Sequence, residues 1–71
     1  MSERIDARGL SCPQPIVLTR NRMKEKGQGI FEVIVDTASS RDNIARLADN
    51  EGWNISEKIM GDEFYLTLIR D

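Results

Sequence analysis

The chain alternates short apolar runs with charged or glycine-containing breaks, and this pattern predicts strands and helices in turn. Charged and apolar residues alternate from Glu3 to Ala7 and stop before Gly9, which is typical of a short first strand and a turn. The dense β-branched and aromatic run from Ile30 to Val35 indicates a central strand that is covered on at least one face. Two more strands are predicted at Asn54–Met60 and Glu63–Arg70, with Gly61-Asp62 as the tight turn between them.

The first helix is expected to run from Cys12 to about Lys26. Proline is favoured at the first helical position, where its missing N–H costs nothing, and Gly27 provides a stop. Cys12 would then be the N-cap. Helical spacing places Ile16 and Met23 on the buried stripe, flanked by the stem of Arg20. Leu18 lies about 200° around the helix from Ile16, so it is expected near the solvent side.

A second helix is expected between the central strand and the closing hairpin. Ser39 or Ser40 can cap its start, Asp42 would lie in its first turn, and Gly52 would end it. Its apolar stripe is predicted at Ile44, Leu47 and Ala48. Trp53 follows the stop and is expected to pack in the core.

The element order is therefore βαβαββ. A right-handed crossover followed by a closing hairpin gives a four-stranded mixed sheet with both helices on one face, a two-layer α/β sandwich. A chain of 71 residues is expected to form a single domain over residues 1–71. Because such a small domain buries only about 60% of the surface of its unfolded chain, any active site should be shallow.

The composition of the chain excludes several kinds of active site. The single Cys and the absence of His exclude Cys/His pairs, His-based metal sites and disulfides within the chain, and no cofactor or metal is expected. A net charge of -2 argues against strong direct binding of nucleic acid through a broad basic surface. Since no segment has the apolar length of a membrane span or a signal peptide, and the one thiol is unpaired, we expect a cytoplasmic monomer with no membrane contact.

Cys12 is the residue to which chemistry can be assigned. A thiol at a helix N-terminus can have its pKa lowered from about 8.5 to between about 3.5 and 7.5. Pro13 and Pro15 lack an N–H and stiffen the backbone, which leaves the N–H of Gln14 able to point at the sulfur. With no general base and no resolving thiol, hydrolysis and dithiol exchange are poorly supported, whereas accepting and passing on one sulfur atom is feasible. A small buried cysteine with a structural role is the competing interpretation.

The segment Gly9-Leu10-Ser11-Cys12-Pro13-Gln14-Pro15 resembles the Cys-Pro-x-Pro signature of the TusA/SirA-like sulfur-carrier family. The resemblance continues through Asp6 to Leu10, the strand ending at Asp36, the helix start at Ser39-Ser40-Arg41-Asp42 and the last strand. It implies the βαβαββ sandwich and a sulfurtransferase that carries a persulfide on Cys12.

The resemblance also implies partners. A PLP-dependent cysteine desulfurase would donate the sulfur, and a downstream acceptor protein would take it toward tRNA thiolation or another sulfur relay. Gln14 stands where the tRNA-thiolation carrier has Glu, so the resemblance leaves the pathway open. Arg20, Asp36 and Arg41 match family positions implicated in docking the desulfurase, and Leu10 and Leu18 could form an apolar rim around Cys12.

The alternative function is a non-enzymatic binding or regulatory module linked to selenium metabolism. Cys12 would then be structural, and the helix face near Leu18 and Arg20 would bind a partner. The first helix carries a basic run, Arg20, Arg22, Lys24 and Lys26. This run fits an acidic partner, but it fits an ordinary solvated helix end equally well.

Overall fold

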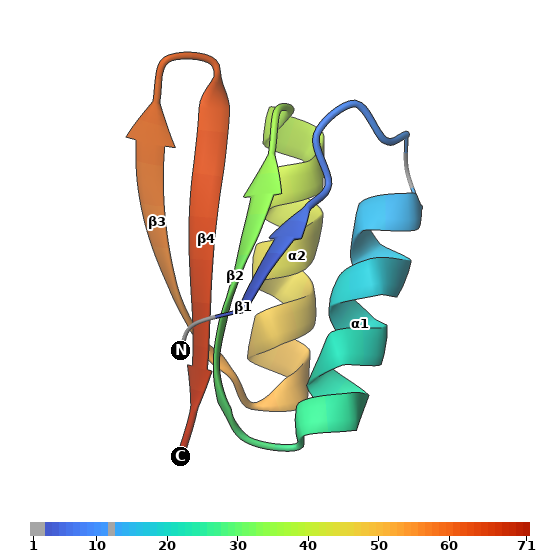
Figure 1. The fold of residues 1–71 in the computed structure, drawn as a ribbon, viewed down its shortest axis with the longest axis vertical. Helices are drawn as coiled ribbons and strands as arrows, with labels where there is room; N and C mark the ends of the chain where they lie inside the picture. Colours follow the sequence, from blue (N-terminus) through green and yellow to red (C-terminus); the bar gives the residue numbers. More distant parts are fainter. Residues whose placement is uncertain (1–2, 12) are drawn as a thin grey trace.

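In residues 3–11 and 13–71, the part of the chain that the computed structural model describes, a four-stranded sheet forms one layer and two helices form the other (Figure 1). The elements are β1 (Glu3–Asp6), α1 (Gln14–Lys26), β2 (Gly29–Val35), α2 (Ala38–Glu51), β3 (Asn54–Met60) and β4 (Glu63–Arg70). The predicted order and the two-layer α/β sandwich are confirmed.

The sheet has the strand order β1-β2-β4-β3, so β1 and β3 are its edges. β1 pairs in parallel with β2, whereas β4 pairs antiparallel with both β2 and β3. The parallel strands β1 and β2 therefore finish at one end of the molecule, where α1 and α2 begin and the β3–β4 hairpin turns (Figure 1). We call this the motif end, because Ser11 and Pro13 lie there.

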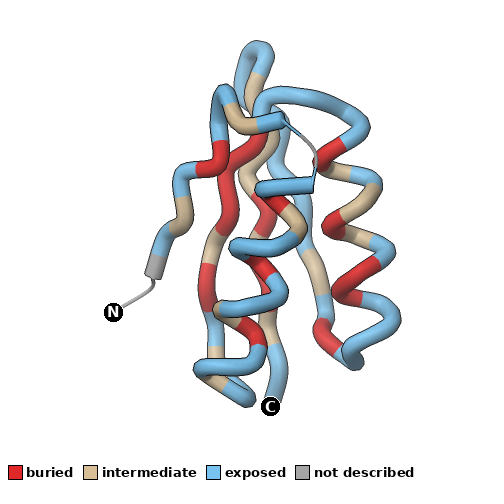
Figure 2. Tube along the Cα trace, turned by 90° about the vertical axis from the view of Figure 1, so that its right-hand side faces the viewer, coloured by how far each residue is buried: buried red, intermediate tan, exposed pale blue. Residues whose placement is uncertain are grey.

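The core fills the space between the inner face of the sheet and the helices, as the buried segments in Figure 2 show. Phe31 and Leu68 are direct cross-strand partners, as are Val33 and Leu66, and all four are buried. The helices contribute buried side chains from Met23, Ile44, Leu47 and Ala48. Trp53 is buried against Phe31 in an edge-to-face contact with ring centroids 5.3 Å apart, so its predicted core role is confirmed.

The start and the buried stripe of α1 differ from the prediction. The helix begins at Gln14 with Pro13 as its N-cap, so the prediction of Cys12 as N-cap is wrong. Pro15, Thr19 and Met23, four residues apart, form the buried stripe, while Ile16 is half-buried and Arg20 exposed. The hydroxyl of Thr19 tolerates burial because it donates to the carbonyl of Pro15 at 2.8 Å.

The cap of α2 also differs. Thr37, in an extended conformation, is the N-cap, and its hydroxyl oxygen accepts from the N–H of Ser40 at 3.1 Å. Ser39 and Ser40 lie inside the helix, so neither is the cap, and Asp42 lies beyond the first turn. The predicted stop is confirmed, because Gly52 closes the helix in the left-handed region at φ 79°.

Candidate functional site

Cys12, the predicted sulfur acceptor, lies outside the described residues, and its position in the chain is between the loop after β1 and the start of α1. Its neighbours on both sides, Ser11 and Pro13, are exposed. The site can therefore be built from the backbone that leads into Cys12, the helix turn that follows it and the side chains around them.

The helix turn after Cys12 offers fewer N–H donors than the sequence suggested. Pro13 and Pro15 have none, and the N–H of Gln14 donates to the carbonyl of Ser11 at 3.0 Å. The prediction that the N–H of Gln14 points at the sulfur is thus wrong, because a tight turn before the helix already uses it.

The loop between β1 and α1 is held to the end of β2. The N–H of Ala7 donates to the carbonyl of Ile34 at 2.9 Å, which extends the parallel ladder past β1. Gly9, at φ 77°, then turns the chain, and its N–H donates to the Asp36 carboxylate at 3.0 Å. Asp36, which the resemblance implicated in docking, therefore anchors the segment that leads into Cys12.

A second anchor, missed in the sequence, is Arg8. Its guanidinium donates to Asp6 at 2.8 and 2.7 Å and to Glu63 at 2.9 Å, so it ties the loop to the β3–β4 hairpin. Hydrogen bonding to Arg8 lowers the pKa of Asp6 to about 2 and also lowers the pKa of Glu63. The hydroxyl of Tyr65 donates to Glu63 at 3.1 Å, and this bond raises the pKa of Tyr65. Residues 6 and 63 are far apart in sequence, so no local pattern could show this cluster.

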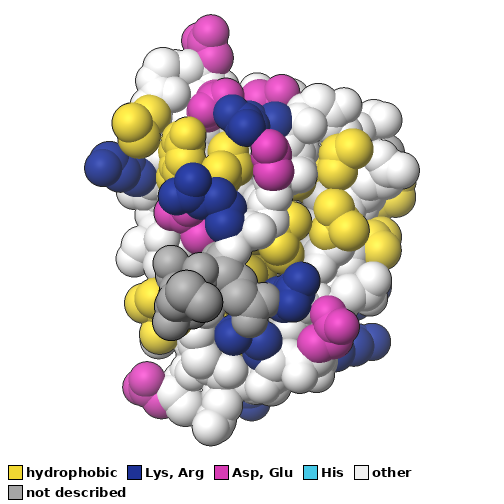
Figure 3. Space-filling model, in the orientation of Figure 1, with side chains coloured by type: hydrophobic (Ala, Val, Ile, Leu, Met, Phe, Trp, Pro, Cys, Tyr) yellow, Lys and Arg dark blue, Asp and Glu magenta, His cyan; other side chains and the backbone are white. Residues whose placement is uncertain are grey.

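An apolar hollow of about 410 Å³ opens beside the first turns of α1, lined by Leu10, Gln14, Val17 and Leu18. Val17 is 46% exposed and Leu18 is 39% exposed, and Figure 3 shows apolar side chains gathered over this part of α1. The predicted rim of Leu10 and Leu18 is thus brought together next to the motif end. Val17 was missed, although its place three residues from Gln14 on the same helix face could have indicated it.

A family model described as Sulfurtransferase TusA matches residues 3–70. The chain belongs to the TusA family. A "putative sulfur carrier protein" of Methanocaldococcus jannaschii is 32% identical over 54 residues, which are 75% of this chain and 72% of that protein. A protein with the same description from Halobacterium salinarum is 29% identical, over 99% of this chain and 89% of its own length. The crystal structure of a SirA-like protein from Desulfitobacterium hafniense is similar, with a TM-score of 0.87 and 28% identity over 93% of each chain.

The predicted docking residues Leu18, Arg20 and Arg41 lie beside separate hollows. Leu18, predicted from helical spacing, lines the apolar hollow, whereas Arg20, which the resemblance implicated, lines a smaller hollow of about 200 Å³ between α1 and α2. Arg41 sits near the other edge of the sheet, where it pairs with Asp42 at 3.0 Å and with Glu57 at 3.2 Å. Docking roles for Arg20 and Arg41 stay predictions, and Arg41 already has ion-pair partners.

The described residues contain no group of three or more His, Cys, Asp or Glu side chains that could hold a metal ion. In the same part of the chain, neither helix has the length and apolar character to cross a membrane.

Proposed function

We propose that this TusA-family protein is a persulfide carrier and sulfurtransferase in which Cys12 both accepts and donates the sulfur. The observation that carries the proposal is the family match over residues 3–70, which includes the one cysteine of the chain. Support comes from the place of Cys12 in the chain, directly before the start of α1, since the field of a helix N-terminus favours a thiolate.

The chemistry needs only one thiolate. The Cys12 thiolate attacks the outer sulfur of a persulfide on the donor, a new S–S bond forms at Cys12, and the donor cysteine leaves as a thiolate. Attack by an acceptor thiolate on the outer sulfur of Cys12 then reverses the arrangement. Neither step changes the overall oxidation state, so no cofactor of the carrier is required.

A PLP-dependent cysteine desulfurase is the proposed donor, and a sulfur-acceptor protein is the proposed recipient. The pathway would be tRNA thiolation or another sulfur relay in the cytoplasm. The frame around Cys12 contributes in two ways: Pro13 and Pro15 stiffen the first helix turn, while Asp36 and Arg8 fix the approaching loop.

The test is sulfur loading followed by intact mass spectrometry without reductant. After incubation with a cysteine desulfurase and L-cysteine, the protein is expected to gain about 32 Da, one sulfur atom, and reductant should remove it. Cys12→Ser should abolish the gain and leave the thermal melt unchanged, since the substitution replaces one sulfur by oxygen.

Two results would contradict the carrier function. One is the absence of any adduct with several desulfurases; the other is a Cys12 that resists iodoacetamide and whose replacement mainly lowers the melting temperature. Either would favour the alternative, a binding or regulatory module linked to selenium metabolism with a structural Cys12.

A further inference from the structure

The loop between β1 and α1 lies at the same end of the molecule as the β3–β4 hairpin (Figure 1), and Arg8 joins the two. Its guanidinium donates to both carboxylate oxygens of Asp6, at 2.8 and 2.7 Å. The remaining terminal nitrogen donates to Glu63 at 2.9 Å. A guanidinium with two parallel bonds to one carboxylate has a fixed plane, so Asp6 sets the direction in which Arg8 reaches Glu63.

The Glu63 carboxylate is oriented from both sides. One of its oxygens accepts from Arg8, and the other accepts from the hydroxyl of Tyr65 at 3.1 Å. Each member of this chain of bonds therefore holds the next in one direction, as outer residues do around a precise site. We call Asp6, Arg8, Glu63 and Tyr65 the loop clamp.

The loop clamp passes over a buried side chain on the face of the sheet that points away from the helices. Ile34 lies between the core residues Val33 and Val35 on β2, so it faces the opposite side, yet it is only 3% exposed. Its cross-strand partners are Asp6 on β1 and Tyr65 on β4. The bonds that join these two residues therefore cross β2 on the side of Ile34, and the loop clamp spans from β1 to β4.

Stability alone is a weak explanation of the loop clamp. The side chains of Arg8, Asp6 and Glu63 are 41%, 53% and 32% exposed. Ion pairs between groups as exposed as these contribute little to the free energy of unfolding. The loop clamp is better explained by the segment that it holds in place.

That segment leads directly into Cys12. The carbonyl of Ser11 accepts a bond from the first residue of α1, so the chain next to Cys12 is tied to the helix. Earlier in the loop, side chains provide the restraints: Asp36 holds the N–H of Gly9, and Arg8 joins the loop to the hairpin. The position of the loop relative to the sheet therefore depends on these two restraints.

We propose that Arg8 and Glu63 are positioning residues for sulfur transfer: the bond between them fixes the loop before Cys12 to the β3–β4 hairpin, so that the thiolate meets the donor persulfide in one orientation. This inference rests on the proposed function, because it concerns the sulfur step at Cys12. The attacking sulfur must lie in line with the S–S bond that breaks, and a small misplacement of a reacting group lowers a rate severalfold or more. Neither positioning residue needs to touch the donor.

The first experiment tests the loop clamp without any partner, by amide hydrogen exchange. Exchange of the Gly9 amide should be about fivefold faster in Glu63→Ala than in the wild type, because the loop opens more often once Arg8 loses the hairpin. Glu32→Ala is the matched control, since it removes the partner of Arg4 on the same face of the sheet and leaves the loop unchanged. Its Gly9 exchange should stay at the wild-type rate.

The second experiment is single-turnover sulfur transfer from a cysteine desulfurase that already carries a persulfide, at rising desulfurase concentrations. Arg8→Ala and Glu63→Ala should each lower the maximal rate by about fivefold and leave the half-saturating concentration unchanged, since orientation affects the reaction step and not binding. Because the two residues act through one bond, the double variant should be no slower than either single variant. Arg4→Ala and Glu32→Ala, the control pair, should keep the wild-type rate.

Alkylation of Cys12 by iodoacetamide distinguishes orientation from thiolate formation. A small reagent reaches the sulfur from several directions, so the alkylation rate and its pH profile should be the same in the wild type, Arg8→Ala and Glu63→Ala. A shifted pH profile would mean that the pair acts on the pKa of the thiol, and that result would overturn the positioning role.

The outcomes separate the two proposals. If the wild type accepts sulfur but the variants keep its rate, lose activity additively or lose no more than the control pair, the positioning role is overturned and the carrier function stands. A raised half-saturating concentration at an unchanged maximal rate would also overturn it, because Arg8 and Glu63 would then contact the donor. Failure of the wild type to accept sulfur would instead overturn the carrier function, whatever the rate of Gly9 exchange.

Discussion

At both edges of the sheet a strand lies beside a helix, but different side chains lie between the strand and the helix. Each edge strand lies beside one helix, with a groove between strand and helix. The groove at β1, of about 490 Å³, is lined by Ile5 and α1 residues, and we call it the β1 groove. Ile55 and α2 residues line the groove at β3. At β3 the Arg41 guanidinium lies over the ring of Phe64, 4.9 Å from its centroid, and pairs with Glu57 of the strand. The groove at β3 is therefore bridged from helix to strand.

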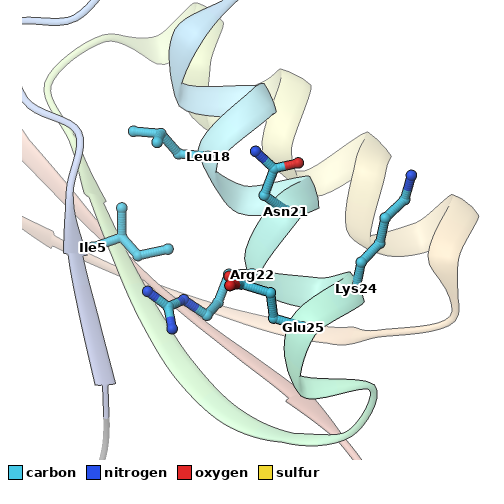
Figure 4. Close-up of a pocket in the computed structure, with 6 residues that line it drawn as sticks. All are labelled: Ile5, Leu18, Asn21, Arg22, Lys24 and Glu25. Atoms are coloured by element: carbon cyan, nitrogen blue, oxygen red, sulfur yellow. The ribbon is translucent and has the colours of Figure 1, made fainter.

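At β1 two apolar side chains, Ile5 and Leu18, face each other across the groove (Figure 4), with Arg22 further along the helix wall. Leu18 also lines the hollow beside the motif end. The edge strand β3 has seven residues and exposes a lysine, Lys58, whereas β1 has only four residues, of which three are charged; short length and exposed charge both discourage pairing with another chain. The comparison teaches that the two edges are protected differently: β1 is short and rich in charged residues, whereas at β3 an ion pair crosses the groove and the strand exposes a lysine.

The largest expected effect comes from placing the same charge at each edge. Leu18→Asp should lower kcat/KM for sulfur loading by about tenfold, or about 1.4 kcal/mol, because it puts a charge on the apolar wall shared by the groove and the hollow. Ile59→Asp on β3 changes the net charge equally at a side chain that is 59% exposed, and it should leave loading near the wild-type value.

Steady-state loading rates over a range of desulfurase concentrations, together with melting temperatures, test this pair. Equal losses in the two variants would mean that charge alone controls docking. A loss only in Ile59→Asp would move the docking surface to the β3 edge.

A smaller effect is expected from Arg8, which links edge strand β1 to the β3–β4 hairpin by bonding Asp6 at the end of β1 and Glu63 at the start of β4. Because the pKa of Asp6 is lowered from 3.8 to about 2 in the folded protein, its stabilising contribution is complete above pH 4 and is lost as the pH falls toward 2. Glu63 shifts in the same direction from 4.5. The free energy of unfolding, measured in urea, should therefore fall more between pH 7 and pH 2.5 for the wild type than for Arg8→Ala.

Arg70→Ala is the control for this pH dependence, since it removes an exposed arginine outside the cluster. Its pH dependence should follow the wild type. If Arg8→Ala loses as much free energy of unfolding at low pH as the wild type does, the cluster contributes nothing to the pH dependence of stability.

Local patterns were enough to predict the fold. The bounds of β3 and β4 follow directly from two β-branched and aromatic runs around Gly61-Asp62, and Gly52 ends α2 where predicted. Helix starts were less predictable because several polar residues compete to cap: Thr37 captures the N–H of Ser40, and the turn at Ser11 moves the start of α1 past Cys12.

The contacts that hold the loop before α1 in place join residues far apart in the sequence, so no local pattern indicates them. The Asp36 bond to Gly9 joins residues 27 positions apart, and the Arg8 bond to Glu63 joins residues 55 positions apart. Leu18 could be recognised as exposed from helical spacing, but its role in two adjoining depressions depends on the position of α1 relative to β1. Sequence thus indicates the proposed sulfur acceptor, and packing determines which residues lie near the motif end.

The smallest expected effect concerns the ion pair that bridges the groove at β3. A double-mutant cycle of Arg41→Ala and Glu57→Ala should give a coupling of about 0.5 kcal/mol in urea unfolding, because both side chains are partly exposed, at 29% and 38%. The coupling should shrink at high salt. Arg4 and Glu32 form the matched pair on the other edge, with Arg4 at 62% exposed and a smaller coupling expected. If instead the Arg41–Glu57 coupling is zero, the pair does not bridge that groove in solution, and the difference between the two edges would rest on the apolar side chains Ile5 and Leu18 of the β1 groove.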